Sequence, residues 1–260
     1  MTAPPPLSVH RSGTGPPVVL LHGGLPADMT WAAQQELAAS WTLIAPNRRG
    51  FAPSPAAARQ DFRADADDLV DLLADLPGGA HLVGYSYGGL GAQLAAERVP
   101  EQVRSLTMVE VPMWNATSGD AVVEAFAELS DRFAADPDDA EAERDFFAAI
   151  GVDPKILAGL GDDVLQALEL GRRLRSPREL EPHFEPIVDA GIPALVLSGD
   201  HHPAHERLCD AIATRLGAQR ARLPGAGHAV QRAQGFNTTL ETFLTAAERV
   251  RGDRGVTDER

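Results

Sequence analysis

The chain is poor in several features that would narrow its class at once. It has one cysteine, so no disulfide can form within it, which suits a reducing compartment. Its formal net charge is −14, and apart from two Arg-Arg pairs it has no basic patch, so nucleic acid and anionic membranes are poor partners. It has no apolar run of membrane-spanning length, and the N-terminal stretch lacks the basic and apolar regions of a signal peptide. We therefore expect a soluble cytoplasmic protein that acts on a small molecule, as a monomer or homodimer.

Short apolar runs alternate with amphipathic stretches along much of the 260-residue chain. Strands are expected at 18–21, 42–45, 81–83, 103–109, 194–198 and 220–223, and helices at 30–39, 62–76, 89–99, 207–216 and 237–250. The alternation stops between 112 and 187, where only helical stretches are expected, at 122–133, 140–150 and 164–174. This pattern predicts an α/β fold: a doubly wound, mostly parallel sheet built from 1–111 and 188–260, with 112–187 inserted as a helical cap.

The most informative motif is the pentapeptide Gly-Tyr-Ser-Tyr-Gly at 84–88. It matches the G-x-S-x-G pattern of a nucleophile elbow, in which a serine is held outward on a sharp turn between a strand and a helix. The expected strand at 81–83 and helix at 89–99 supply that context. Glycines on both sides of the serine suit a turn that brings backbone segments too close for a Cβ atom. We therefore interpret Ser86 as a nucleophile.

A serine nucleophile needs a neighbouring base and donors for an oxyanion. His228 follows the last expected strand in the glycine-rich loop 224–228, so it is expected at the carboxyl edge of the sheet, where the elbow also lies. The backbone N–H groups of Tyr87 and Gly24 are the expected oxyanion donors. His22 stands in the same loop as Gly24, and we interpret its ring as a brace for that loop rather than as a catalytic group.

Several motifs together resemble the α/β-hydrolase fold family, in particular its serine hydrolase and esterase–haloperoxidase-like branch. They are the His-Gly-Gly loop at 22–24, the Arg-Arg-Gly loop at 48–50, the elbow at 84–88 and Gly-Ala-Gly-His at 225–228. The resemblance extends over about residues 7–250 and implies hydrolysis through an acyl-enzyme, without a cofactor. Members of this family carry out ester, lactone, amide, peroxyacid and carbon–carbon chemistry on one frame, so the resemblance is more specific for fold than for reaction.

The third member of the expected triad is where the chain departs from its family. Family members usually place an acid shortly after the strand that corresponds to 194–198. His202 stands at that position here, and Asp200 comes two residues earlier. Some members place the acid after the strand that follows the elbow helix, where this chain has Glu110. We favour Glu110 and keep Asp200 as the alternative; a further possibility is that Glu110 only pairs with an arginine of the 48–50 loop.

The surroundings of the expected site are apolar. Side chains expected to line a pocket beneath the cap, unless they belong to the core, are Leu25, Tyr85, Tyr87, Met113 and Trp114. His201, His202 and His205 form a histidine-rich tract, which we interpret as a solvent-exposed loop and helix start. We expect no metal site there, because no carboxylate or cysteine is placed to complete a set of ligands.

Three functions are compatible with these residues. The favoured one is a serine hydrolase that cleaves a small, mostly apolar ester, lactone or related carbonyl compound through an acyl-enzyme. The alternatives are a cofactor-free perhydrolase of the haloperoxidase type and a ligand-binding homologue with little turnover. Phosphate-binding and dinucleotide-binding fingerprints are absent from the chain. A dehalogenase or epoxide hydrolase of this fold would need an aspartate in place of Ser86.

Overall fold

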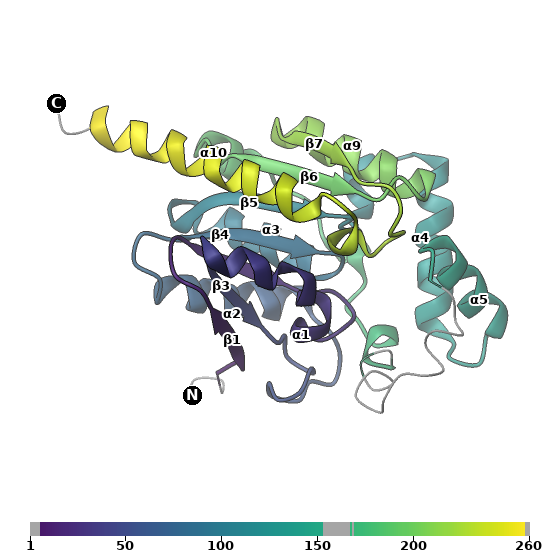
Figure 1. Ribbon diagram of the computed structural model, residues 1–260. Helices are drawn as coiled ribbons and strands as arrows, with labels where there is room; N and C mark the ends of the chain where they lie inside the picture. The colour runs from purple at the N-terminus through teal and green to yellow at the C-terminus, as the bar shows by residue number, and fades with distance from the viewer. Residues whose placement is uncertain (1–5, 153–166, 168, 258–260) are drawn as a thin grey trace.

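Seven strands form one sheet in the computed structural model, which describes residues 6–152, 167 and 169–257 (Figure 1). The strands are β1 (Val9–Ser12), β2 (Pro17–Leu21), β3 (Thr42–Pro46), β4 (Ala80–Tyr85), β5 (Val103–Val109), β6 (Ala194–Ser198) and β7 (Gln219–Arg222). Their order across the sheet is β1-β3-β2-β4-β5-β6-β7. All neighbouring pairs are parallel except β1 with β3. The predicted doubly wound, mostly parallel sheet is confirmed, and β1 is an antiparallel edge strand that the sequence pattern did not predict.

Helices cover both faces of this sheet. The α-helices are α1 (Ala27–Thr30), α2 (Phe62–Ala74), α3 (Gly88–Arg98), α4 (Ala121–Ala135), α5 (Ala140–Ala149), α8 (Glu185–Asp189), α9 (Pro203–Leu216) and α10 (Phe236–Thr257). Short 3-10 helices are η1 (Ala32–Ala39), η2 (Pro100–Gln102), η3 (Trp114–Thr117), η4 (Pro177–Glu179) and η5 (Val230–Arg232). The helix expected at 30–39 is therefore split into one α-helical turn and a 3-10 helix. Of the helix expected at 164–174, residues 164–166 and 168 lie outside the described part of the chain.

The period-two alternation of the strands sorts side chains into two cores. In β2, Val18 and Leu20 pack with α10 and η1 on one face, while Val19 and Leu21 pack with α2 and α3 on the other. All four side chains are at most 2% exposed. Burial on both faces explains why β2 reads as a continuous apolar run, as central strands of parallel sheets do.

Local signals fix the helix ends beside the sheet. The side chain of Asp61 accepts a hydrogen bond from the backbone N–H of Arg63 and so caps α2. Helix α9 begins at Pro203, where a missing N–H costs nothing, and ends at Gly217 in the left-handed conformation. Capping therefore accounts for the start of α2 and for both ends of α9.

In the region predicted as a cap, the described residues form helices joined by loops. Helices α4 and α5 lie beyond the carboxyl ends of the strands (Figure 1). Between 112 and 187, the described residues add no strand to the sheet, and Leu174 forms a single isolated bridge with Gln60. Near the end of this region, Leu180, Phe184 and Ile187 join the core between the sheet and α3. In the described parts of the chain, every helix is too short or too polar to cross a membrane.

Candidate active site

Ser86 occupies the turn that joins β4 to α3. Its backbone has φ of 51°, in the left-handed region that a non-glycine residue rarely adopts. The turn is held from both sides: Ser86 N donates to Val109 O at 2.8 Å, and Gly89 N donates to Ser86 O at 2.9 Å. Strained backbone maintained by its surroundings is typical of functional turns. The local geometry is that of the nucleophile elbow predicted from the sequence.

Two glycines make this turn sterically possible. A Cβ atom on Gly84 would lie 2.5 Å from Gly89 Cα, and one on Gly88 would lie 2.2 Å from His22 O. Both distances are far below any van der Waals contact, and the atoms met belong to backbone, which cannot rotate away. Substitution at either glycine would therefore force β4, α3 and the 22–24 loop apart.

His228 lies between Ser86 and Glu110 and forms hydrogen bonds with both. Its Nε2 is 2.9 Å from Ser86 Oγ, and its Nδ1 is 2.6 Å from Glu110 Oε2. The backbone N–H of His228 donates to Ile150 O at 3.1 Å, which connects the histidine loop to the end of α5. With the Nδ1 proton directed at the carboxylate, Nε2 is left to accept the hydroxyl proton of Ser86.

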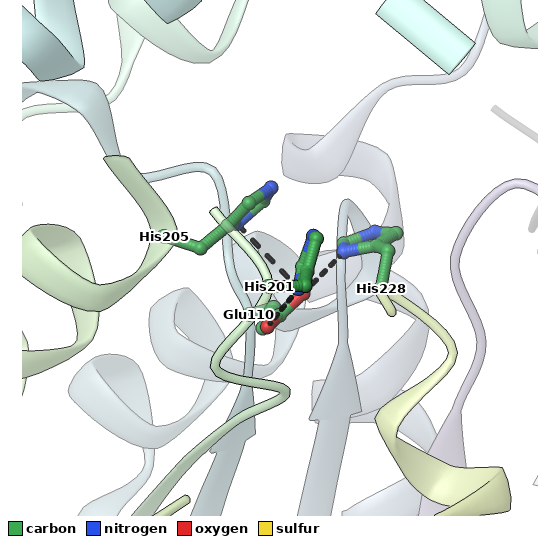
Figure 2. Close-up of side chains that lie close together, drawn as sticks. All are labelled: Glu110, His201, His205 and His228. Carbon is green, nitrogen blue, oxygen red and sulfur yellow. Dashed lines mark hydrogen bonds and ion pairs between the residues drawn. The ribbon is translucent and has the colours of Figure 1, made fainter. Parts of the chain in front are cut away.

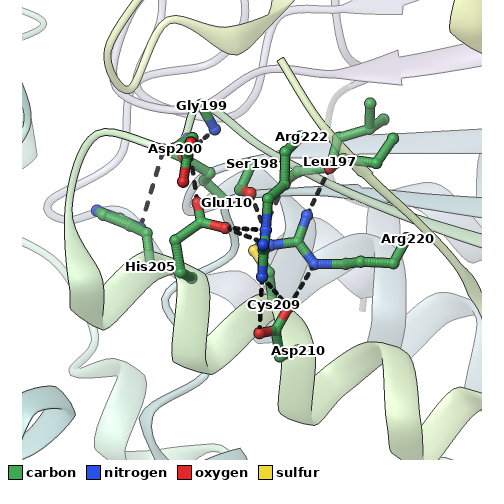
Figure 3. Close-up of polar contacts among 12 residues, drawn as sticks. Glu110, Leu197, Ser198, Gly199, Asp200, His205, Cys209, Asp210, Arg220 and Arg222 are labelled. Atoms are coloured by element: carbon green, nitrogen blue, oxygen red, sulfur yellow. Dashed lines mark hydrogen bonds and ion pairs between the residues drawn. The ribbon is translucent and has the colours of Figure 1, made fainter. Parts of the chain in front are cut away.

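Glu110 follows β5 directly and, like Ser86, has positive φ, at 44°. It is 1% exposed. Besides Oε2, which faces His228, its Oε1 accepts a hydrogen bond from Gly199 N at 2.6 Å (Figure 3). Burial opposes the ionised form and by itself would raise the pKa of Glu110, but contacts with His201 and His228 outweigh it and hold the pKa well below its usual range. The carboxylate therefore stays charged opposite the histidine.

The other candidate acid lies elsewhere. Asp200 is exposed, has φ of 51°, and its backbone N–H donates to Glu206 Oε1 at 3.1 Å. The arginines of the 48–50 loop are paired with acids other than Glu110: Arg48 with Asp65 at 3.1 Å, and Arg49 with Asp68 at 2.6 Å. Of the two carboxylates proposed from the sequence, the structure brings Glu110 to His228.

His22 braces the loop that it stands in, as the sequence suggested. Its ring is fully buried, with Nδ1 3.0 Å from Gly23 O and Nε2 accepting from Arg48 N at 2.9 Å. Burial, with the nearby Arg48 charge adding to it, holds the pKa of His22 well below its usual value, so the ring is neutral. Arg48 also donates to Gly23 O at 2.8 Å. This buried network keeps the 22–24 loop against the elbow.

The predicted oxyanion donors belong to the two segments that meet at Ser86. A Cβ atom on Gly23 would lie 2.9 Å from Ser86 Cβ, so the 22–24 loop touches the elbow. Gly24 and Tyr87 both line the cavity that contains Ser86 and His228. Their assignment as oxyanion donors remains a prediction, supported by this placement.

A cavity of about 420 Å³ opens above Ser86 and His228. This volume lies within the range of small-molecule sites. Its described lining is mostly apolar and includes Leu25, Met29, Tyr85, Phe133, Phe146, Phe147, Ile150, Val152 and Leu174. The aromatic residues of α4 and α5 were not among the pocket residues predicted from the sequence, although the amphipathic pattern of both helices was a usable signal. The cavity thus lies between the sheet edge and the helices of the predicted cap.

Two sequence expectations about this site need correction. Met113 and Trp114 are 0% and 5% exposed and are not among the described residues that line the cavity. Met113 belongs to the core beneath the sheet, and Trp114 packs edge-on against Phe126 with 5.6 Å between ring centroids. The interpretation of the histidine tract as solvent-exposed was also wrong for His205, which is 3% exposed. The fold turns that residue inward beneath α4, because it lies on the buried face of α9.

The chain matches the alpha/beta hydrolase fold over residues 16–148 and belongs to that family. It is 30% identical over 244 residues to lipase LipV of Mycobacterium tuberculosis, a match that covers 88% of this chain and 93% of that protein. It is 37% identical over 134 residues to a pimeloyl-[acyl-carrier protein] methyl ester esterase of Chromobacterium violaceum, covering 48% of this chain and 51% of the esterase. Matches to this and other curated relatives span about half of their length or less.

Solved structures agree on the fold. MenH from S. aureus superposes with a TM-score of 0.70 at 16% identity, covering 93% of this chain and 98% of that one. The naproxen esterase from Bacillus subtilis gives a TM-score of 0.64 at 20% identity, covering 91% of this chain and 86% of that one. At these sequence identities the structural likeness establishes the fold alone, and the reaction must be inferred from the residues of the site.

Proposed function

We propose that this protein is a serine hydrolase that cleaves small, mostly apolar carboxylic esters through an acyl-enzyme. The observation that carries the proposal is the hydrogen-bonded chain from Ser86 Oγ to His228 Nε2, and from His228 Nδ1 to Glu110 Oε2, at the floor of an apolar cavity. The names of its relatives, which include a lipase and methyl ester esterases, point to the same class of reaction.

Each group has a definite part in the proposed reaction. Ser86 Oγ attacks the ester carbonyl while His228 Nε2 accepts its proton. The N–H groups of Gly24 and Tyr87 stabilise the oxyanion, and protonated His228 then donates its proton to the departing alcohol. Water, deprotonated by His228, cleaves the acyl-enzyme. Glu110 holds the imidazole in the required tautomer and stabilises its positive charge during both steps.

The nucleophile can be tested by Ser86→Ala, with Ser118→Ala, an exposed serine in the cap region, as the matched control. Ser86→Ala should abolish hydrolysis of p-nitrophenyl butyrate and labelling by a fluorophosphonate, whereas the control should retain both. Circular dichroism should show that both variants are folded. Near-wild-type turnover by folded Ser86→Ala would rule out Ser86 as the nucleophile.

The apolar lining predicts how activity depends on the acyl chain. Burial of each additional methylene contributes about 0.8 kcal/mol, so kcat/KM should rise up to about fourfold per methylene until the cavity is filled. Among the described lining residues, the arginine is Arg232, which is exposed and already donates to Met29 O at 3.1 Å. A carboxylate at the end of an acyl chain would therefore be buried without a cationic partner, which is costly. We therefore expect neutral acyl chains to be preferred over chains of equal length that end in a carboxylate. The reverse preference would contradict the proposed substrate class.

Perhydrolysis uses the same residues, with hydrogen peroxide in place of water at the acyl-enzyme. Peracid formation from an ester and peroxide, measured beside ester hydrolysis, separates the two reactions. The placement of Glu110 beside His228 supports turnover over a ligand-binding role, because an acid lies at the histidine although His202 occupies the usual position of the acid in the family.

A further inference from the structure

Two histidines that the proposed reaction does not use lie against the acid of the triad. His201, in the loop after β6, has Nδ1 3.3 Å from Glu110 Oε1, and His205, in the first turns of α9, has Nδ1 3.9 Å from Glu110 Oε2. Figure 2 shows both rings and His228 directed at the one carboxylate. Segments from three parts of the chain thus bring three imidazoles to a single buried carboxylate.

The nitrogens of His201 and His205 lack hydrogen-bond partners among the described residues. This holds for both ring nitrogens of each residue, although the side chains are only 12% and 3% exposed. More than nine in ten buried polar groups in proteins have a partner, and a neutral imidazole has one donor and one acceptor to satisfy. The two Nδ1 atoms contact only Glu110, and neither Nε2 atom has a hydrogen-bond partner among the described residues, so the cluster is a candidate ligand site.

The spacing of these groups suits a small cation. One ligand atom each from Glu110, His201, His205 and His228 can be chosen so that all four lie within 4.8 Å of one another. Ligand atoms around a tetrahedral zinc ion, with bonds of about 2.0–2.2 Å, lie roughly 3.3 Å apart. Zinc binding therefore requires side-chain rotations that bring the most distant of these atoms about 1.5 Å closer together. Imidazole and carboxylate ligands favour Zn²⁺ over Mg²⁺ or Ca²⁺, which prefer all-oxygen sites.

Metal binding here would compete with the proposed triad for the same atoms. The 2.6 Å between His228 Nδ1 and Glu110 Oε2 is shorter than the spacing of two ligands on one zinc ion, because a proton lies between these atoms. A cation held by both groups would replace that proton and draw the imidazole away from its orientation toward Ser86.

We propose that Glu110, His201, His205 and His228 form a Zn²⁺ site whose occupation inhibits the hydrolase. No metal site was expected from the sequence, because no carboxylate or cysteine was expected to complete a set of ligands, and the fold supplies Glu110 from the end of β5. Zinc enters as a free divalent cation, releases the proton between His228 and Glu110, and leaves when a chelator removes it. The site would make activity depend on the supply of free zinc.

Binding is tested first without reference to activity. The metal-stripped full-length protein and Ser86→Ala are titrated with zinc chloride by isothermal calorimetry, and with Co²⁺ for the visible absorption of tetrahedral cobalt. We expect one ion per chain in both proteins, because Ser86 is not a ligand. Binding should weaken at least about tenfold in His205→Gln and in the double variant His201→Asn/His205→Gln. Zinc binding is measured without substrate and also in Ser86→Ala, so the binding result does not depend on whether Ser86 is the nucleophile.

His183→Gln is the matched control, because His183 is exposed and pairs only weakly with Glu97 at 3.4 Å, far from the cluster in the fold. It should bind zinc like the wild type. Absence of zinc binding to wild type and Ser86→Ala, or equal binding by His201→Asn/His205→Gln, would overturn the proposed site. Thermal melts check that each variant folds. If His205→Gln does not fold, the single variant His201→Asn is used in its place.

Inhibition is tested with p-nitrophenyl butyrate, and each variant is normalised to its own rate without metal. Zinc should inhibit wild type and His183→Gln at the concentration at which it binds, and EDTA should restore the rate. His205→Gln should need at least about ten times more zinc for equal inhibition. Zinc binding at 1:1 with no loss of wild-type activity would show that Glu110 and His228 are not ligands, and would overturn the inhibitory role.

Discussion

The loops that follow β5 and β6 begin alike and end with opposite roles. The two strands pair in parallel, with Val109 opposite Leu197, and each loop contains an acidic residue at positive φ, Glu110 at 44° and Asp200 at 51°. Glu110 is buried against His228, while Asp200 faces solvent. The loop after β6 contributes a backbone N–H, from Gly199, to hold Glu110 in place.

The orientation of the two side chains explains the difference. Strands β5 and β6 are neighbours in the sheet, and β5 lies directly beside β4, whose end positions Ser86. The Glu110 carboxylate is buried between His228 Nδ1 and Gly199 N, whereas the Asp200 side chain is exposed. The comparison teaches that an acid at a strand end joins the site only where its side chain is directed at the histidine, and that its position in a sequence motif does not decide this. Four substitutions test this comparison.

Glu110→Gln should have the largest effect. The amide is nearly isosteric with the acid but cannot hold the imidazole in the required tautomer or stabilise its charge. We expect kcat for ester hydrolysis to fall about 10²–10⁴-fold, as acid-to-amide changes do in other triads. Steady-state kinetics on a folded variant provides the measurement. A loss below about tenfold would mean that Glu110 is not the acid.

Glu110→Asp tests distance while keeping the charge. The shorter side chain would place the carboxylate one methylene farther from His228 Nδ1, with which it forms a 2.6 Å contact, and farther from Gly199 N. Misplacement of a catalytic group by about 1 Å can cost 10²-fold, so we expect a kcat loss of about that size, with KM little changed. Full activity in this variant would show that charge alone suffices and that the short contact is dispensable.

Arg220→Met should damage the loop after β6 without damaging the site. Arg220 donates to Ser198 Oγ at 2.7 Å and to Glu206 at 2.7 Å, and its loss leaves the buried Ser198 hydroxyl without this partner (Figure 3). We expect the free energy of unfolding to fall by about 1–3 kcal/mol in urea denaturation. Arg222→Met is the control: Arg222 pairs with the same Glu206 but its side chain is 49% exposed, so about 1 kcal/mol or less is expected. Equal losses in the two variants would contradict this reasoning.

Asp200→Asn should have the smallest effect. The Asp200 side chain is exposed and its backbone N–H, which bonds Glu206, is unchanged by the substitution. Surface substitutions of this kind usually change the free energy of unfolding by about 0.5 kcal/mol or less. Because Asp200 bonds neither His228 nor Ser86, we also expect kcat to change by no more than about twofold, since a surface substitution removes no interaction made in the transition state. A loss as large as that of Glu110→Gln, measured in the same assay, would reverse the assignment of the two acids.

Much of the site was predictable because its signals are local. The elbow at 84–88 needs glycines where backbone segments nearly touch, and the alternation of strands and helices places Ser86 and His228 at one edge of the sheet. Glu110 was favoured for the same reason: it follows the strand expected beside the elbow. These inferences depend on the order of elements along the chain, which a sequence records directly.

Other features depend on contacts between segments far apart in the chain, and the tertiary structure decided them. The bond from Gly199 N to Glu110 spans 89 residues and the one from His228 to Glu110 spans 118. The inward turn of His205 and the burial of Trp114 depend on how α4 packs against α9, which their own sequences do not encode. By itself the sequence determined the fold class and the placement of Ser86 and His228 at one sheet edge, because these follow from backbone sterics and from the order of elements along the chain. The choice of acid and the histidine cluster around it follow from how the ends of β5 and β6 and the start of α9 pack together.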